Sequence, residues 1–253
     1  VEPGLQEALT EAMATGRLHF TTTPEPADVF IIAVQTHYRE TPEKKRVSDM
    51  RFVESAAREV GSVIRPGGLC VLESTSPPGS TRLVEQIVSE VSGLKPEEFM
   101  TAHCPERIIP GRMLLELRQN DRIIGSNRPE AAEYAKSIYE KVVTKGTIRL
   151  TDDLTAEMCK LTENTFRDIN IAYANELSKV CDRLGIDVFQ LIELANCHPR
   201  VNVHTPGVGV GGHCIAVDPW FIHEKFEDIT PLIYEARLVN DGKPAWTADR
   251  IAR

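Results

Sequence analysis

The sequence predicts an α/β protein in which a parallel sheet, formed within residues 1–150, precedes an all-helical domain formed by residues 151–253. The first observation is a series of short, continuous apolar runs, which are typical of strands buried on both faces. The second is that segments with helical periodicity separate these runs, as in parallel sheets with right-handed crossovers. The third is a stretch of about thirty residues after Asp152 that has helical character throughout and would extend for about 45 Å.

The elements of the first half follow from these patterns. Strands are expected at residues 28–34, 68–75, 99–102, 121–125 and 147–150. Helices are expected at residues 48–63, 80–91 and 129–142. Ligands of such sheets bind beyond the carboxyl ends of the strands. The segments predicted to lie there are Gln35–His37, Ser74–Gly79 and His103–Pro110.

The second half is expected to consist of helices. An acidic N-cap, Asp152 or Asp153, begins the long helix, and Gly185 ends it. Further helices are expected at residues 188–196, 219–226 and 231–253.

Composition narrows the class of protein. A length of 253 residues allows two domains. The net charge of −8 argues against nucleic acids and anionic membranes as partners, and no apolar run is long enough to span a membrane or to serve as an export signal. The six cysteines are scattered without zinc-like spacing, so we expect no metal site, and reduced thiols in a cytoplasmic protein. Because the chain starts at Val1 and ends within a predicted helix, we expect it to be a fragment.

The segment Gly207–Trp220 carries the clearest chemical signal. It places Cys214 directly after a glycine-rich loop and a carboxylate, Asp218, four residues later. Glycines allow a substrate to approach the backbone closely, and an exposed thiol can act as a nucleophile. The alternative is a surface loop with a buried, inert cysteine. The glycines also match the spacing G-x-G-x-x-G, but no apolar strand precedes them, so a dinucleotide fingerprint is rejected.

A second constellation lies on the long helix. Lys160, Asn164 and Arg167 are spaced i, i+4 and i+7, so their side chains project from one face. A solvated polar face is the alternative, but Asn is a poor helix former and has no reason to occupy such a position. A lysine with an amide one turn away is suited to stabilising a developing oxyanion.

Together these motifs resemble the UDP-glucose/GDP-mannose dehydrogenase family of NAD-dependent, four-electron sugar-nucleotide oxidoreductases. The resemblance covers essentially the whole chain. It rests on five motifs: Glu73–Gly79, Cys104–Arg107, Glu157–Asn164, His198–Asn202 and Gly207–Trp220. It implies that residues 1–150 are the C-terminal part of a Rossmann-like NAD-binding domain, without its Gly-rich half, and that residues 151–253 are a helical central dimerisation domain. The family's C-terminal nucleotide-sugar domain would follow.

The resemblance also implies roles for single residues. Cys214 would be the nucleophile, Lys160 and Asn164 would stabilise alkoxide and tetrahedral oxyanions, and Asp218 would support them or activate water. Glu106 would be the loop carboxylate available for hydrolysis, where some members have a second glutamate and this chain has Pro110. NAD would contact Thr36 and Thr75. The sugar nucleotide would contact Arg107, Ile108, Lys160, Asn164, Arg167, His198, Arg200 and Gly211. The arginine that matches Arg200 commonly reaches into the neighbouring subunit's site, which implies a homodimer through the long helix.

The reaction so implied is oxidation of a UDP-sugar at C6 to the uronic acid through a Cys thiohemiacetal and thioester, in polysaccharide biosynthesis. The sequence Gly211–Phe221 is most similar to members that oxidise UDP-N-acetyl-D-mannosamine. UDP-N-acetylglucosamine and UDP-glucose are alternative substrates. A non-catalytic dimerising paralogue is a further alternative, which the joint presence of Lys160, Asn164, Cys214 and Asp218 disfavours.

Overall fold

The computed structural model describes residues 2–43 and 45–252, which form two units. Unit 1 contains the described residues up to Thr36 together with Met50–Lys160. Unit 2 contains the described residues of His37–Asp49 together with those from Leu161 onward. The second unit thus receives a short segment from the first half of the chain.

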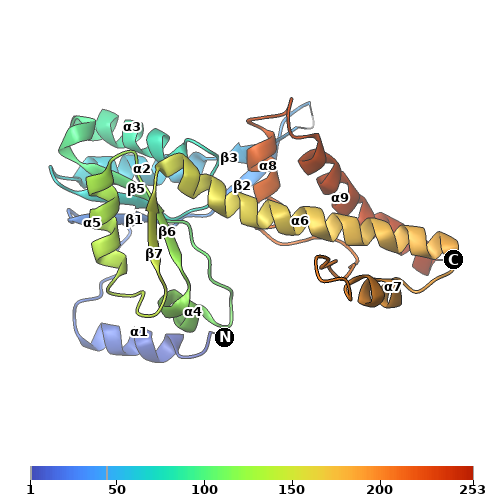
Figure 1. Ribbon diagram of the computed structural model, residues 1–253. Helices are drawn as coiled ribbons and strands as arrows, with labels where there is room; N and C mark the ends of the chain where they lie inside the picture. Colours follow the sequence, from blue (N-terminus) through green and yellow to red (C-terminus); the bar gives the residue numbers. More distant parts are fainter. Residues whose placement is uncertain (1, 44, 253) are drawn as a thin grey trace. The chain divides into compact units, whose positions relative to one another are not determined.

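Unit 1 is built on a five-stranded sheet (Figure 1). In spatial order its strands are β1 (Val29–Ile32), β4 (Leu69–Leu72), β5 (Met100–His103), β6 (Arg122–Gly125) and β7 (Ile148–Thr151). All five strands occur where the sequence predicts them.

Two strands, β6 and β7, run opposite to the other three, which differs from the expected parallel arrangement. β5 and β6 are antiparallel and pair at His103 and Gly125, whereas β1–β4, β4–β5 and β6–β7 are parallel pairs. Between β5 and β6 the chain forms one short helix, α4 (Met113–Gln119). β6 therefore starts at the edge where β5 ends, which is possible without a crossover helix.

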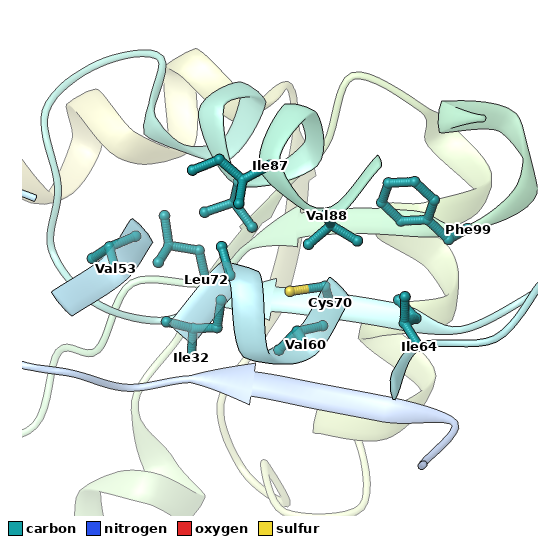
Figure 2. Close-up of a cluster of buried hydrophobic side chains, with 11 residues drawn as sticks. Ile32, Val53, Val60, Ile64, Cys70, Leu72, Ile87, Val88 and Phe99 are labelled. Atoms are coloured by element: carbon teal, nitrogen blue, oxygen red, sulfur yellow. The ribbon is translucent and has the colours of Figure 1, made fainter. Parts of the chain in front are cut away.

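Helices cover both faces of this sheet. α2 (Arg51–Val63) and α3 (Ser80–Ser92) pack against each other on one face, and α5 (Pro129–Tyr139) lies on the other (Figure 1). The side chains of β4 alternate between the two faces, as the pleat requires. Cys70 and Leu72 belong to the cluster under α2 and α3 (Figure 2), and the other two residues of the strand belong to the cluster under α5.

β1 is less buried than its apolar sequence predicts. Ile32 is buried, but Ile31 is 49% exposed. β1 pairs with β4 alone among the described strands and forms one edge of the sheet. Because Ile32 packs under α2 and α3, Ile31 points to the other face, where α5 packs against β4, β5, β6 and β7.

Unit 1 also contains elements that the sequence analysis does not predict, α1 (Leu5–Ala14), α4 and a short 3-10 helix, Pro96–Glu98. None of the three contains a buried residue. Glu2, which precedes α1, accepts hydrogen bonds from the backbone N–H groups of Gly111 and Met113, both at 2.6 Å.

The long helix α6 (Asp153–Leu184) is confirmed and continues from unit 1 into unit 2. Its N-cap is Asp152, whose side chain accepts a hydrogen bond from the N–H of Thr155 at 2.8 Å. It ends before Gly185, which has a φ of 68°. The other helices of unit 2 are α7 (Val188–Ala195), α8 (Asp218–His223) and α9 (Pro231–Ile251), all close to their predicted bounds.

Unit 2 also contains a β-hairpin, although the sequence predicts only helices for this domain. β2 (His37–Glu40) and β3 (Arg46–Asp49) pair antiparallel, and the sequence analysis does not predict them. Glu224 of α8 accepts hydrogen bonds from the N–H and the hydroxyl of Ser48, at 2.6 and 2.7 Å. The guanidinium of Arg46 lies 4.9 Å from the ring centres of both Tyr38 and Trp220. These side-chain contacts explain why a segment with many charged residues forms strands here.

No helix in the described part of the chain is long and apolar enough to cross a lipid bilayer.

Candidate active site

The clearest cluster of predicted site residues lies within unit 2. Asn164 of α6 donates a hydrogen bond from Nδ2 to Oδ2 of Asp218 at 2.6 Å, and both residues are buried. Cys214 is exposed, and its carbonyl oxygen accepts the N–H groups of Val217 and Asp218, both at 2.9 Å. A single turn thus leads from the exposed Cys214 to the buried Asp218, the first residue of α8, and Asp218 in turn binds the buried amide of Asn164.

The glycine-rich loop that leads to Cys214 is anchored at its start. The N–H of Gly207 donates to Oδ1 of Asn175 at 2.9 Å. A Cβ on Gly209 would come within 2.7 Å of Pro244 Cγ, so only glycine allows this approach of the loop to α9. A Cβ on Gly211 would meet no atom within 4 Å, and the residue is exposed.

A buried polar network supports this anchor. Asn175 donates to Oδ1 of Asn240 at 2.9 Å, and Asn240 donates to the carbonyl and Oδ1 of Asp168, at 3.0 and 2.8 Å. Arg237 forms ion pairs with Asp168 and Asp241. Burial raises the pKa of Asp168, and Arg237 acts in the opposite direction. Polar groups buried in this way must satisfy one another, so they hold α6, α9 and the loop in one arrangement.

A pair of histidine rings lies beside the cysteine loop. His213, the neighbour of Cys214, packs edge-on against His37 of β2, with ring centres 5.6 Å apart. The hairpin therefore contributes a side chain to the surroundings of the loop, a role that the sequence analysis does not assign to it.

Lys160 is half-buried on α6, one turn before Asn164. Three residues earlier, Glu157 accepts hydrogen bonds from the N–H of Gly79 at 2.6 Å, the N–H of Thr81 at 2.7 Å and the Thr81 hydroxyl at 2.6 Å. Burial raises the pKa of Glu157, and these donors favour its ionised form. Glu157 thereby ties the start of α3 to α6 close to Lys160.

The carboxyl ends of β1 and β4 are joined by small hydroxyl side chains. Thr36 donates from Oγ1 to the carbonyl of Thr75 at 2.7 Å. Ser74 accepts the N–H of Val34 at 2.8 Å and donates to its carbonyl at 2.7 Å. Half-buried threonines with polar backbone groups at this edge fit a dinucleotide that binds at the carboxyl ends of the strands.

Glu106 lies just beyond β5, and contacts within unit 1 involve both of its carboxylate oxygens. Oε1 accepts the N–H groups of Arg107 at 2.6 Å and Ile108 at 2.9 Å. Oε2 accepts Nη2 of Arg122 at 2.9 Å. Arg122 itself is buried, and the sequence analysis does not identify it. A charged residue at the start of an apolar strand is a signal that could have revealed it.

Three further predicted substrate residues belong to unit 2. Arg167 is exposed on α6, and His198 and Arg200 are exposed on the segment after α7. Asn196 shapes that segment by accepting the N–H of Val203 at 2.7 Å and donating to its carbonyl at 3.0 Å. Among the described residues, no hydrogen bond joins these side chains to Cys214.

Two family models match the chain. Residues 1–143 match the "UDP-glucose/GDP-mannose dehydrogenase family, NAD binding domain", and residues 154–242 match the central domain of the same family.

Individual proteins are also similar. The chain is 48% identical over 259 residues to UDP-N-acetyl-D-mannosamine dehydrogenase of Yersinia pestis, covering 99% of this chain and 60% of that protein. It is 48% identical over 262 residues, with the same coverage, to NDP-N-acetyl-D-galactosaminuronic acid dehydrogenase of Ralstonia nicotianae. Among solved structures, UDP-D-ManNAc dehydrogenase of Pyrococcus horikoshii superposes with a TM-score of 0.91 at 42% identity, covering 98% of this chain and 59% of that one. The chain thus spans about 60% of the length of these relatives.

Proposed function

The chain belongs to the UDP-glucose/GDP-mannose dehydrogenase family, and from this premise we propose that the protein oxidises UDP-N-acetyl-D-mannosamine at C6 to the uronic acid. The observation that carries the proposal is the buried Asn164–Asp218 pair next to the exposed Cys214. A purely structural module would have no need for an exposed thiol one turn before a buried carboxylate that binds a buried amide.

The first oxidation removes a proton and a hydride from the C6 alcohol and leaves an aldehyde. NAD, when bound, accepts the hydride in each of the two oxidations. In our proposal Lys160 and Asn164 stabilise the alkoxide that precedes hydride loss, because their side chains are one turn apart on α6. Asp218 accepts one N–H of the Asn164 amide, which fixes the orientation of the amide, and in our proposal the second N–H donates to the oxyanion.

Cys214 captures the aldehyde in the second stage. Its thiolate forms a C–S bond, and the carbonyl oxygen becomes the alkoxide of a thiohemiacetal. Loss of a second hydride from the same carbon gives a thioester, and water cleaves the C–S bond to release the carboxylate and restore the thiol. Covalent capture retains the reactive aldehyde and divides one difficult oxidation into separate steps.

NAD-binding and substrate-binding roles complete the proposal. Thr36 and Thr75 would contact NAD at the carboxyl edge of the sheet, where their mutual hydrogen bond holds both in place. The sugar nucleotide would contact residues of several segments, namely Arg107, Ile108, Arg167, His198, Arg200 and Gly211. The exposure of Arg167, His198, Arg200 and Gly211 is consistent with contacts to a ligand.

We further propose a cytoplasmic homodimer that associates through α6. Phe166, Tyr173 and Val180 are 62%, 54% and 47% exposed and are spaced seven residues apart, so they form one apolar stripe along the helix. Asn164, Asp168 and Asn175 lie on the opposite side and are buried. A second copy would cover such a stripe, and Arg200 would serve the site of the partner.

The test is NADH production by the full-length protein, with UDP-N-acetylmannosamine, UDP-N-acetylglucosamine, UDP-N-acetylgalactosamine and UDP-glucose supplied in parallel. We expect two NADH per molecule of UDP-N-acetylmannosamine and no turnover by Cys214→Ala. The galactosamine sugar is included because the second relative is equally identical to this chain.

The outcomes distinguish the proposed substrate from another UDP-sugar and from a protein without catalytic activity. Preference for another UDP-sugar would retain the chemistry and contradict the proposed substrate. If none of the sugars produced NADH, the non-catalytic dimerising paralogue would become the better explanation. As a control, Cys197→Ala removes the other exposed thiol among the described residues and should leave turnover unchanged.

A further inference from the structure

We infer that His37 of β2 is a positioning residue for Cys214 and that it acts through the ring of His213. The inference rests on the proposed function for the chemistry that Cys214 performs. It rests on contacts within unit 2 for the positioning itself. No proton or hydride transfer is assigned to either imidazole.

The cysteine loop has few restraints just before Cys214. Hydrogen bonds fix the loop at the N–H of Gly207 and at the carbonyl of Cys214. Within the described part of the chain, no hydrogen bond holds the backbone of residues 208–213. Gly212 has a φ of 86°, and a Cβ on Gly211 or Gly212 would meet no atom within 4 Å. Glycines without close neighbours leave the backbone several conformations, so the position of the thiol depends on a further restraint.

The ring of His213 provides this restraint. The side chain is exposed, and its ring packs edge-on against His37 with ring centres 5.6 Å apart. Among the described residues, this contact is the one hydrogen bond, ion pair or ring contact of the His213 side chain. Flat rings favour such an edge-on arrangement at this separation. Because His213 and Cys214 share a peptide bond, a fixed ring at position 213 limits where the thiol can point.

His37 is the better fixed partner in this contact. It is half-buried, and its Nδ1 donates to the carbonyl of Tyr38 at 2.8 Å, since a carbonyl oxygen can only accept. It is also the first residue of β2 and pairs with Asp49 of β3. The two hydrogen bonds from Ser48 to Glu224 attach this hairpin to α8 (Figure 1). A ring held by its own nitrogen and by its strand can therefore orient a ring that has no other such contact.

The position of Cys214 matters at one stage of the proposed reaction. Loss of the first hydride from the alcohol does not involve the thiol. Capture of the aldehyde requires Sγ to be aligned with the carbonyl carbon, and a small displacement of a reacting atom slows such a step strongly. Loss of the His37 contact should therefore impair aldehyde capture and leave the first oxidation nearly unchanged.

Three variants of the full-length protein test this. In His37→Ala we expect formation of the uronic acid to slow about tenfold. With semicarbazide present to trap free aldehyde, NADH should fall from two toward one per UDP-N-acetylmannosamine. His37→Phe keeps a flat ring for the edge-on contact and should restore two NADH per sugar and a rate within about threefold of the unaltered protein. His19→Ala makes the same change as His37→Ala at an exposed position of unit 1 and should alter neither quantity.

Other outcomes would overturn the inference. If His37→Phe were as impaired as His37→Ala, the imidazole itself would be required and ring packing would not explain its role. If His37→Ala lowered turnover without release of aldehyde, or left turnover unchanged, the contact would not serve the capture step. His213→Ala removes the same contact from its exposed side and retains the test if His37→Ala fails to fold. The double variant should be no worse than the more impaired single one, because all three lose one contact.

A measurement that needs no turnover tests the positioning separately. Amide hydrogen exchange in the peptide that contains Gly211–Cys214, corrected for the intrinsic rates of each sequence, should be about fivefold faster in His37→Ala and in His213→Ala. In His37→Phe it should stay close to that of the unaltered protein. Unchanged exchange in both alanine variants would refute the positioning. Absence of NADH from the unaltered protein with every UDP-sugar would refute the proposed function, and the exchange result would still stand.

Discussion

At the scale of single residues, Asp218 determines which way the amide of Asn164 faces. The carboxylate is 3% exposed and accepts Nδ2 of Asn164, so the amide cannot rotate to present its oxygen instead. We predict that Asp218→Asn lowers kcat by about 10²-fold, because an amide at position 218 can donate as well as accept and no longer holds the Asn164 amide in one orientation. Steady-state NADH production by the full-length protein measures the effect.

Glu235→Gln is the matched control for this substitution. It makes the same chemical change at an exposed position of α9 and should leave kcat unaltered. If Asp218→Asn retained nearly full kcat, Asn164 would not depend on Asp218 for its role.

His103 provides a prediction about pH at the same scale. It is fully buried on β5, and burial lowers its pKa from 6.5 to about 4. Between pH 6.5 and about pH 4 the unfolded chain therefore binds a proton at this residue and the folded chain does not. The stability of the fold consequently falls as the pH decreases through this range. From pH 7.5 to pH 5 we expect a loss of roughly 2 kcal/mol from this group.

The loss should be absent in His103→Leu, whatever its absolute stability. Urea denaturation of both proteins at the two pH values measures the difference. If the free energy of unfolding changed equally with pH in the two proteins, His103 would not be kept neutral by burial.

At the scale of elements, the packing of α9 on α6 depends on a buried ion pair. Asp168 and Arg237 are 0% and 1% exposed. We predict that Arg237→Met destabilises the protein by about 3 kcal/mol or more, because it leaves a buried carboxylate without its cation. The double variant Asp168→Leu/Arg237→Met should recover much of this loss.

Urea denaturation of the single and double variants checks this prediction. Arg250→Met breaks an exposed ion pair with Asp182 between the same two helices and should change stability by less than about 1 kcal/mol. An Arg237→Met protein as stable as the Arg250→Met control would contradict the account.

The elements themselves follow largely from local sequence patterns. The apolar strands and the long helix lie within a few residues of their predicted positions, because burial and helical periodicity are properties of consecutive residues. The hairpin was not predictable in this way, since Arg46 and Ser48 are stabilised by Trp220 and Glu224, which lie more than 170 positions further along the chain. The direction of β6 was missed for a related reason, because apolar runs carry no information about strand orientation.

In the candidate site, too, some residues could be predicted from local sequence and others depend on contacts between distant segments. Cys214, Asp218, Lys160 and Asn164 stand in motifs with characteristic spacing, so they could be named from the sequence. The partners that hold the site could not, since Arg122 contacts Glu106 only after β6 pairs with β5. Asn175 likewise meets Gly207 only after the chain has folded back on α6.

At the scale of the whole molecule, the proposed homodimer depends on the apolar stripe of α6. We predict that Tyr173→Glu converts the dimer of the full-length protein into a monomer, because a charge would be buried without a partner in the middle of the stripe. Sedimentation velocity measures the change. Lys145→Glu places the same charge on an exposed residue of unit 1 and should leave the dimer intact.

A mixing experiment tests whether the two subunits share their active sites. Arg200→Ala and Cys214→Ala should each be inactive. If Arg200 serves the partner, a mixed dimer of the two variants contains one complete pair, with Cys214 from one subunit and Arg200 from the other. After subunits exchange at random, about a quarter of the original activity should return. If Arg200 serves its own subunit, neither site of the mixed dimer is complete and no activity returns, so the exposure of Arg200 would need another explanation.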